Sequence, residues 1–208
     1  MTLNNLKIPF KNKNRIETNY SQACQDLFVL SCLDGKDNGF FLELGCNQPI
    51  IYSNTYLLES KFNWNGISID IQQHCVDMFK DIRKCNALCK DALSINYEEL
   101  LKDKNHIDYL SLDLDPAVIT LECLKKIPFN KIEFSVITYE HDYYRFKDYC
   151  RDESRKIFLE NNYYLLASNV NISGLVFEDW YINIKYVDLN KVNLFKSENL
   201  ESKNIIFY

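Results

Sequence analysis

Short apolar runs alternate with helical patterns along most of the chain. The apolar runs end in glycine or acidic residues, as buried strands of a parallel sheet often do, and the segments between them repeat apolar residues every three or four positions. The expected strands are residues 40–44, 66–71, 87–93, 107–115 and 131–142, followed by two terminal strands within residues 163–183. The expected helices are residues 21–33, 53–62, 72–85, 96–104, 117–127 and 144–162.

This alternation, from residue 40 to residue 165, predicts an α/β fold with a mainly parallel central sheet and helices on both faces. In such sheets, ligands bind at the carboxyl ends of the strands. The residues to consider are therefore those that end the strands, and most of them are acidic. They are Glu43, Gly45, Asp70, Asp91, Asp113, Asp115, Glu140, His141 and Asp142.

The composition is that of one globular domain. The 208 residues are 47% hydrophobic and 25% charged, which suffices for a full core. We expect a single domain over residues 1–208. Within it, residues 1–20 form a polar lead-in, residues 21–183 form the core and residues 184–208 form a C-terminal extension.

Charge and hydropathy narrow the class of partner. The formal net charge of −5 argues against a nucleic-acid partner, whose binding surface would be basic. No apolar run is long enough to cross a membrane, and the N-terminus lacks the apolar segment of a signal peptide. We therefore expect a cytoplasmic protein without a nucleic-acid partner. The eight cysteines form no C-x-x-C pair and are expected to be reduced thiols.

The strand ends carry groups that suit a nucleoside. Gly45 permits a tight turn and close approach of a ligand to the backbone. The loop that follows, CNQPIIYSNT, is not the G-x-G-x-x-G cradle of a dinucleotide. Asp70 ends the second strand, where a carboxylate can accept hydrogen bonds from ribose hydroxyls. Asp91 and Ala92 end the third strand, where they could meet an adenine edge. The alternative is that Glu43, Asp70 and Asp91 are ordinary loop acids.

These motifs resemble those of the class I S-adenosylmethionine-dependent methyltransferases: FFLELGCN their first motif, GISIDI the second-strand acid and KDA the adenine-side motif. This class has a Rossmann-like sheet with an antiparallel C-terminal strand. The resemblance implies that Glu43 and Gly45 hold the methionine end of S-adenosyl-L-methionine and that Asp70 binds its ribose. The full expected cofactor-binding set is Gln25, Glu43, Gly45, Asn47, Ser53, Asn54, Thr55, Asp70, Ile71, Asp91, Ala92 and Asp113.

Within that set, Ser53, Asn54 and Thr55 begin an expected helix, whose N-terminus could hold the cofactor carboxylate. Simple capping of the helix is the alternative for these three residues.

The order of the motifs narrows the resemblance to the FkbM family of methyltransferases. The pieces, in chain order, are SQACQDLFVL, FLELGCNQPIIYSNTYLLES, WNGISIDI, IDYLSLDLD, ITYEHD, SRKIFLENNYYLL and FEDWYIN. This resemblance implies methylation of a hydroxyl oxygen, often on a sugar or a glycosylated small molecule. Two departures bear on the site: Asn47-Gln48-Pro49 replaces a second glycine, and Pro116 replaces the glycine of D-x-E-G.

Removal of a proton from a hydroxyl requires a base or a metal ion. His141 is the expected general base, because histidine as a residue type ordinarily titrates close to working pH, with Asp113 and Glu140 as catalytic neighbours. Alternatively, Asp113, Asp115, Glu140 and His141 could bind Mg²⁺ or Mn²⁺. A third possibility is that these residues only cap the strand.

Two rival functions remain open on the sequence. A nicotinamide-dependent oxidoreductase would use a similar sheet but needs a glycine-rich phosphate loop. A catalytically silent binding module would bind a cofactor or ligand without turnover. Three arginines after His141 could hold an anionic substrate or could form a solvated helix face; they are Arg145, Arg151 and Arg155.

Overall fold

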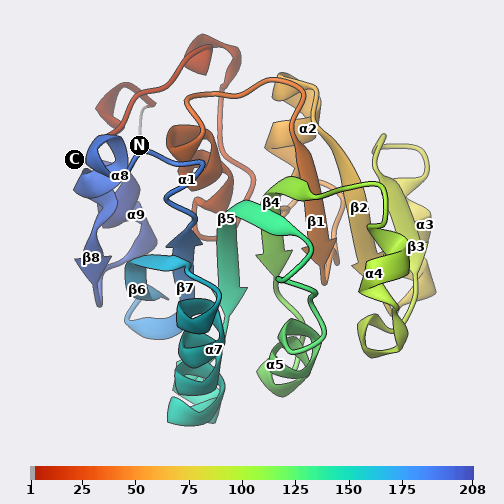
Figure 1. Cartoon of the computed structure of the whole chain (residues 1–208). Helices are drawn as coiled ribbons and strands as arrows, with labels where there is room; N and C mark the ends of the chain where they lie inside the picture. Colours follow the sequence, from red (N-terminus) through yellow and green to blue (C-terminus); the bar gives the residue numbers. More distant parts are fainter. Residues whose placement is uncertain (1–2) are drawn as a thin grey trace.

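The computed structural model describes residues 3–208 (Figure 1). Within this range, eight strands form one sheet in the order β3-β2-β1-β4-β5-β7-β6-β8. The first five strands are β1 (Phe40–Leu44), β2 (Asn65–Asp70), β3 (Asn86–Cys89), β4 (His106–Leu112) and β5 (Glu133–Glu140). The last three are β6 (Tyr164–Ile172), β7 (Leu175–Ile182) and β8 (Ser197–Glu198).

The sheet is mainly parallel, as the alternation of strands and helices predicts. Strands β3, β2, β1, β4 and β5 pair in parallel, and β7 runs antiparallel to both β5 and β6. The prediction of a Rossmann-like α/β sheet with an antiparallel C-terminal strand is therefore confirmed. From β1 the chain first adds β2 and β3 on one side and then continues with β4 and β5 on the other side. This change of side opens a crevice at the carboxyl ends of the strands next to β1.

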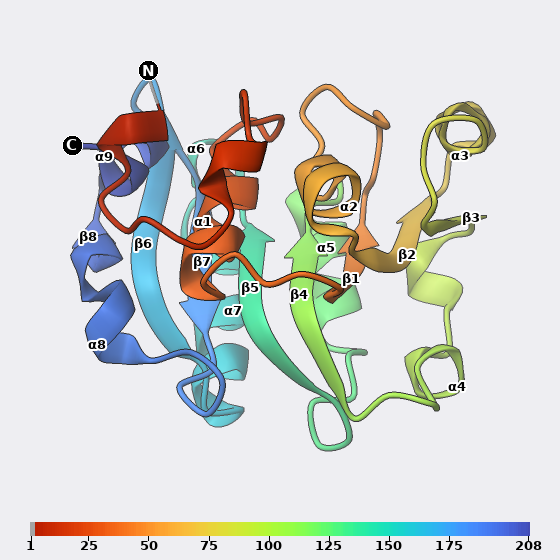
Figure 2. The ribbon, with the colours of Figure 1, turned by 90° about the horizontal axis from the view of Figure 1, so that it is seen from above.

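Helices cover both faces of the sheet (Figure 2). On one face lie α1 (Gln25–Cys32) and α2 (Tyr56–Phe62), and on the other lie α5 (Ala117–Leu124) and α7 (Asp148–Glu160). The remaining helices are α3 (Gln73–Phe79), α4 (Tyr97–Leu100), α6 (Tyr143–Phe146), α8 (Leu189–Val192) and α9 (Ser202–Ile206).

Each face has its own apolar core. On the α1 face, the ring of Phe28 stacks on Trp180 with their centroids 4.5 Å apart. On the α7 face, the ring centroid of Phe158 lies 4.2 Å from that of Tyr181. Trp180 and Tyr181 are consecutive residues of β7, so their side chains alternate between the two cores.

The segments expected to be a polar lead-in and a C-terminal extension pack together. Leu6, Ile8 and Phe10 are buried in the core of the α1 face. Leu6 forms a β-bridge with Phe207, and the N–H of Lys7 donates to the carbonyl of Ile206 at 2.9 Å. These apolar residues alternate with Lys7 and Pro9, a short period of two that the interpretation of residues 1–20 as a polar lead-in did not use.

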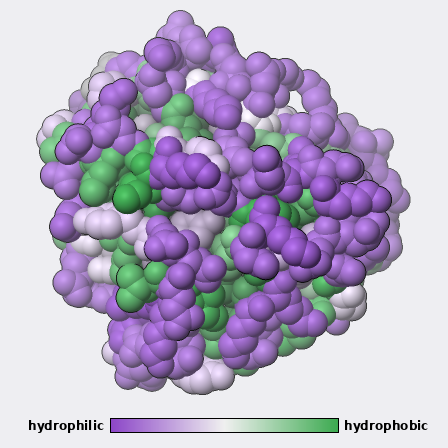
Figure 3. Space-filling model, viewed as in Figure 1, coloured by the Kyte–Doolittle hydropathy of each residue, from purple (hydrophilic) through white to green (hydrophobic). Residues whose placement is uncertain are grey.

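The face viewed in Figure 3 is covered mainly by hydrophilic residues, with apolar residues in separate small patches. Among the helices of residues 3–208, none is both long enough and apolar enough to cross a bilayer.

Candidate functional site

A pocket of about 370 Å³ lies where β1, β2, β4 and β5 end. The residues that line it come from the loops after these strands and from the segment before α1. They are Gln22, Glu43, Gly45, Cys46, Asn47, Gln48, Ile51, Tyr52, Asn54, Asp70, Ile71, Gln72, Asp113, Leu114, Asp115 and Glu140. A larger hollow of about 460 Å³ lies near the amino end of β4, but it is lined by surface residues such as Lys102 and Lys131 and by none of the strand-end acids.

Gly45 brings the ends of β1 and β4 together. Its φ of +86° is a left-handed conformation, and a Cβ atom at this position would lie 1.7 Å from the carbonyl oxygen of Asp113. The N–H of Asp113 donates to the carbonyl of Leu44 at 3.0 Å. Any larger residue at position 45 would therefore force the two strand ends apart, which explains why the first turn requires glycine.

Asp70 holds the loops that follow β1 and β2. Its Oδ2 accepts a hydrogen bond from the N–H of Asn47 at 3.0 Å, and its Oδ1 accepts one from the N–H of Gln72 at 2.8 Å. Each carboxylate oxygen can accept a second hydrogen bond, so the group can also bind hydroxyls of a ligand. The next residue, Ile71, is 67% exposed and forms an apolar wall of the pocket.

Glu43 is buried near the carboxyl end of β1, and hydroxyl groups donate hydrogen bonds to its carboxylate. Thr55 Oγ1 donates to it at 3.0 Å and Ser68 Oγ at 2.7 Å. Burial raises the pKa of Glu43, although the charge of Arg83 and these hydrogen bonds oppose the shift. Glu43 lines the pocket, where we expected it to hold the methionine end of a cofactor, and it also anchors the loop that runs from β1 to α2.

Arg83 is a buried residue that the sequence did not indicate. It donates to the carbonyl of Pro49 at 3.1 Å, to Ser53 Oγ at 3.2 Å and to Thr55 Oγ1 at 2.8 Å. It was expected on a helix over residues 72–85, but α3 ends at Phe79 and Arg83 lies in the turn beyond it. The guanidinium therefore ties down the loop that forms one side of the pocket.

The three residues before α2 have different tasks. Ser53 Oγ accepts from the N–H of Tyr56 at 3.1 Å and so caps the helix, while Thr55 Oγ1 contacts Glu43. Asn54 alone of the three lines the pocket. Its Nδ2 donates to Ser111 Oγ at 3.0 Å, and its buried Oδ1 has no hydrogen-bond partner among residues 3–208.

Asp113 and Glu140 form a pair of carboxyl groups at the ends of β4 and β5. Burial raises the pKa of Asp113. Burial and then the charge of Asp113 raise the pKa of Glu140 well above its ordinary range. Burial and the repulsion between the two carboxyl groups therefore both favour the protonated form of Glu140.

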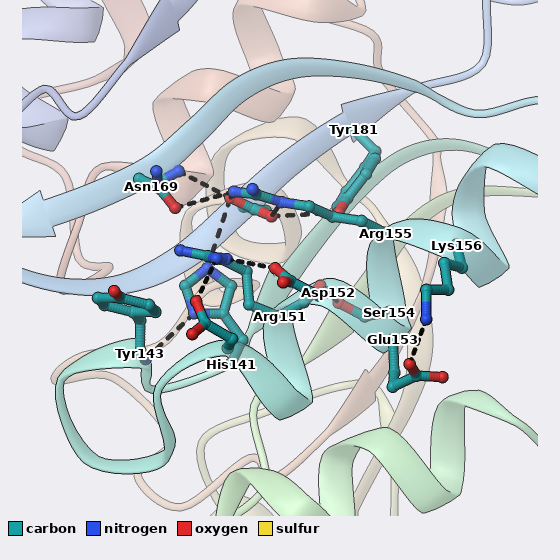
Figure 4. Close-up of polar contacts among 12 residues, drawn as sticks. His141, Tyr143, Arg151, Asp152, Glu153, Ser154, Arg155, Lys156, Asn169 and Tyr181 are labelled. Carbon is teal, nitrogen blue, oxygen red and sulfur yellow. Dashed lines mark hydrogen bonds and ion pairs between the residues drawn. The ribbon is translucent and has the colours of Figure 1, made fainter.

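His141 lies in the interior and does not line the pocket. Its Nδ1 accepts from the N–H of Tyr143 at 3.2 Å, and its Nε2 is 3.4 Å from Asp179 Oδ1 (Figure 4). Arg155 donates to both oxygens of Asp179, at 2.7 and 2.9 Å. Although burial alone would raise the pKa of Asp179, hydrogen bonds and charges from His141 and Arg155 lower it. His141 thus has no free lone pair directed at the pocket, which argues against the expected role as general base.

The expected metal site is not supported. Among residues 3–208, no group of three or more His, Cys, Asp or Glu side chains has a geometry that could hold a metal ion. Of the four expected ligands, His141 faces Asp179, and Asp115 accepts from Arg145 at 2.8 Å. The remaining two, Asp113 and Glu140, form a pair of carboxyl groups, which is fewer than the three ligands of a candidate metal site.

The other expected cofactor residues lie outside the pocket lining. Gln25 is buried beneath it, where its Nε2 donates to Glu178 Oε2 at 3.2 Å; the lining residue on this segment is Gln22. Asp91 is exposed and caps a short turn through the N–H of Leu93, and Ala92 is buried behind that turn. A ligand that reached from the pocket past Ile71 would approach this turn, because Lys90 N–H donates to the carbonyl of Asp70 at 2.9 Å.

The arginines after His141 all face carboxylates. Arg145 contacts Asp115 and Asp142, Arg151 contacts Asp148 and Asp152, and Arg155 contacts Asp179. None of the three lines the pocket.

No protein-family model matches the chain, and no curated protein matches its sequence. Solved structures match its fold. An rRNA methylase from Streptococcus thermophilus is 14% identical, with 76% of this chain and 93% of that one covered and a TM-score of 0.51. A protein from Clostridium thermocellum assigned as an rRNA methylase is 10% identical, with 80% and 97% covered and a TM-score of 0.55.

A member of the NADB-Rossmann superfamily from Streptococcus agalactiae is 12% identical, with 91% of this chain and 75% of that one covered and a TM-score of 0.53. The chain has a Rossmann-like methyltransferase fold. At such low identities the likeness establishes the fold alone, and the narrower resemblance to the FkbM family stays a prediction.

The pocket of this methyltransferase fold is strongly acidic. Five of its lining residues are carboxylic acids: Glu43, Asp70, Asp113, Asp115 and Glu140. Among the described residues that line it, none is Lys, Arg or His. A pocket of this charge attracts cations and repels phosphates.

Proposed function

We propose that the protein is an S-adenosylmethionine-dependent methyltransferase that binds its cofactor in the strand-end pocket. The observation that carries the proposal is the charge of that pocket, five carboxyl groups without a basic residue, at the carboxyl ends of β1, β2, β4 and β5. S-adenosylmethionine bears a sulfonium and an ammonium group against one carboxylate, so its net charge is positive and complements the pocket.

The residues present fit this cofactor. Asp70 would accept hydrogen bonds from ribose hydroxyls, and Ile71 would lie against the base. At the other end of the pocket, the unpartnered Oδ1 of Asn54 and the carboxyl of Glu43 would receive an ammonium group. A buried acceptor without a donor costs free energy, which a bound ammonium group would recover.

A nicotinamide dinucleotide is a poorer fit for the same pocket. Its pyrophosphate carries negative charge and needs N–H donors from a glycine-rich turn. The loop between β1 and α2 contains one glycine, Gly45, and the walls of the pocket are acidic. An rRNA acceptor, which the names of two structurally similar proteins indicate for those proteins, would meet the same repulsion here.

The reaction proposed is methylation of a hydroxyl oxygen, on a sugar or a glycosylated small molecule as the FkbM resemblance implies. The bound cofactor would supply the methyl group from its sulfonium. Asp113, ionised and hydrogen-bonded to protonated Glu140, would accept the hydroxyl proton as the new C–O bond forms and the S–C bond breaks. The raised pKa of Asp113 makes it a better proton acceptor than an exposed carboxylate.

Calorimetric titration tests the cofactor class. We expect S-adenosylhomocysteine to bind with micromolar affinity and NAD⁺ not to bind. Asp70→Asn should weaken binding by about 10- to 100-fold, the worth of hydrogen bonds to a charged group. Asp91→Asn is the matched control, because Asp91 is exposed and outside the pocket lining, and it should change the affinity less than Asp70→Asn. Tighter binding of NAD⁺, or equal effects of the two variants, would refute the assignment.

Turnover then separates an enzyme from a silent binding module. Purified protein with S-adenosylmethionine and a panel of saccharides should release S-adenosylhomocysteine, measured by mass spectrometry, and should do so equally with EDTA or with added Mg²⁺ or Mn²⁺. Cofactor binding without release across the panel would favour the silent module. Loss of turnover in EDTA would restore the metal hypothesis.

A further inference from the structure

Four carboxyl groups and one guanidinium lie at the outer end of the pocket, beyond β4 and β5, and the guanidinium contacts two of the carboxyl groups. The carboxyl groups belong to Asp113, Asp115, Glu140 and Asp142, and the guanidinium belongs to Arg145. Even if one of the four carboxyl groups is protonated, negative charge exceeds positive charge at this corner. We call these five residues the acidic corner.

One atom of the acidic corner lacks a partner. Asp142 is 3% exposed and has a left-handed backbone, with a φ of 46°. Its Oδ2 accepts from Arg145 at 3.3 Å, but its buried Oδ1 receives no hydrogen bond from an N–H or hydroxyl donor of residues 3–208. A buried carboxylate oxygen without a donor is costly, so a ligand that brings an N–H group would be stabilised there.

Arg145 shows that this corner holds a cation. Its Nη1 lies 2.8 Å from Asp115 Oδ1 and 3.3 Å from Asp142 Oδ2. The attachment is weak, because Arg145 is 45% exposed, the Asp115 side chain is 76% exposed and α6 has four residues. Another cation can therefore replace this guanidinium at little cost.

We propose that the acidic corner is the acceptor subsite and that it binds an ammonium group, so that the molecule to be methylated is an amine-bearing saccharide. The ammonium replaces the Arg145 guanidinium between Asp115 and Asp142. This arrangement places the remainder of the acceptor beside Asp113 and Glu140, where a hydroxyl can lose its proton. The inference rests on the proposed function for the reaction and on the acidic corner for the charge of the acceptor.

The opposite assignment would make Arg145 the anchor of a phosphorylated or nucleotide-linked sugar. The surroundings oppose it, because an anion at Arg145 would lie among four carboxyl groups and would first have to break the two ion pairs of the guanidinium. The two assignments predict opposite signs for removal of the Arg145 charge. An amine would bind more tightly without its competitor, whereas a phosphate would lose its anchor.

Ligand-observed NMR with the full chain and saturating S-adenosylhomocysteine tests this sign. The probes are glucosamine, N-acetylglucosamine and glucose 6-phosphate, at about pH 6, where an amine is protonated. We expect glucosamine to bind at least about tenfold more tightly than either other sugar, the difference of about one favourable charge contact. Arg145→Gln should tighten glucosamine binding several-fold, and Asp115→Asn should weaken it.

Lys131→Gln is the matched control, because it removes the same charge from the opposite end of β5, where Lys131 pairs with Glu98. It should leave all three affinities unchanged. The proposal is overturned if glucosamine binds no better than N-acetylglucosamine, which includes the case in which neither sugar binds. It is also overturned if Arg145→Gln weakens the binding of glucosamine, or if glucose 6-phosphate binds more tightly than glucosamine.

A separate titration without S-adenosylhomocysteine distinguishes the two proposals. Glucosamine binding by a protein that does not bind S-adenosylhomocysteine would refute the cofactor assignment and leave the subsite in place. Binding of S-adenosylhomocysteine without selectivity for the amine would refute the subsite and leave the cofactor assignment in place.

Discussion

The Cα atom of Gly45 packs directly against the backbone of Asp113, so that a Cβ atom would lie 1.7 Å from the Asp113 carbonyl oxygen. This contact joins the turn after β1 to the residue proposed to accept the proton. The geometry of the cofactor turn and that of the catalytic carboxyl pair therefore depend on the same backbone approach.

Gly45→Ala should disrupt both the turn after β1 and the carboxyl pair of Asp113 and Glu140. The added methyl group must displace the Asp113 backbone, and alanine is strained at a φ of +86°. We expect a loss of more than about 2 kcal/mol in the free energy of unfolding, measured with urea, and loss of S-adenosylhomocysteine binding. Gly174→Ala is the control, since Gly174 has a φ of +79° but no atom within 4 Å of its added Cβ. Equal losses in the two variants would mean that the contact with Asp113 does not matter.

Asp113→Asn should separate catalysis from binding. An amide cannot accept the hydroxyl proton, so we expect kcat to fall by at least about 100-fold. The affinity for S-adenosylhomocysteine, which lacks the sulfonium charge, should change by less than about threefold, or about 0.7 kcal/mol. Single-turnover rates and calorimetry measure the two quantities, and an unchanged kcat would exclude Asp113 as the proton acceptor.

His141→Gln should preserve turnover, because glutamine can accept from the Tyr143 N–H and donate to Asp179 in place of the imidazole. His141→Ala removes both contacts inside the protein and should lower the free energy of unfolding by about 2–4 kcal/mol. The readout is the pH dependence of kcat in His141→Gln. A profile that loses its acidic limb in this variant, that is, the fall of kcat as a general base becomes protonated, would restore histidine as the general base.

Glu178 should make stability depend on pH. Burial raises its pKa from 4.5 to about 8, although hydrogen bonds from Trp180 and Gln25 oppose the shift. The folded protein thus holds a proton that the unfolded chain has lost between about pH 4.5 and about pH 8, so the free energy of unfolding falls as pH rises through this window. The Glu178 contribution is fully present below pH 4.5.

Urea unfolding at several pH values measures this decline. Glutamine at position 178 is neutral at every pH and keeps the hydrogen bonds, so the free energy of unfolding should decline less in Glu178→Gln than in wild type. The difference should be a few kcal/mol at most, because one pKa unit corresponds to about 1.4 kcal/mol. Glu198→Gln, at an exposed position, is the control. A decline of the same size in wild type and Glu178→Gln would show that Glu178 does not titrate in this window.

Arg83→Lys should loosen the loop between β1 and α2. Lysine keeps the charge but cannot reach the carbonyl of Pro49 and the hydroxyls of Ser53 and Thr55 at once. We expect the affinity for S-adenosylhomocysteine to fall by about three- to tenfold, or about 0.7–1.4 kcal/mol, measured by calorimetry. Arg151→Lys, whose partners lie on the surface of α7, should have no effect on affinity.

The strands and their order of appearance could be predicted, because their apolar runs are buried on both faces and end in glycine or acid. The acids Glu43, Asp70, Asp113 and Glu140 were found for the same reason: the carboxyl ends of parallel strands meet at one edge. The task of His141 could not be predicted, because it depends on Asp179, a residue of β7 placed beside it by antiparallel pairing with β5. Arg83 and Gln22 gave no signal, since each lies in a turn whose course only the packed structure defines.

The β-bridge between Leu6 and Phe207 has a consequence for synthesis of the chain. Residues 6–10 are made long before Ile205, Ile206 and Phe207, which belong to the same core of the α1 face. On the ribosome, the central sheet can assemble as its strands emerge, but this seam forms only after residues 205–207 have left the exit tunnel. Until then, Leu6 lacks the partner of its β-bridge and is a natural target for a chaperone that binds nascent chains.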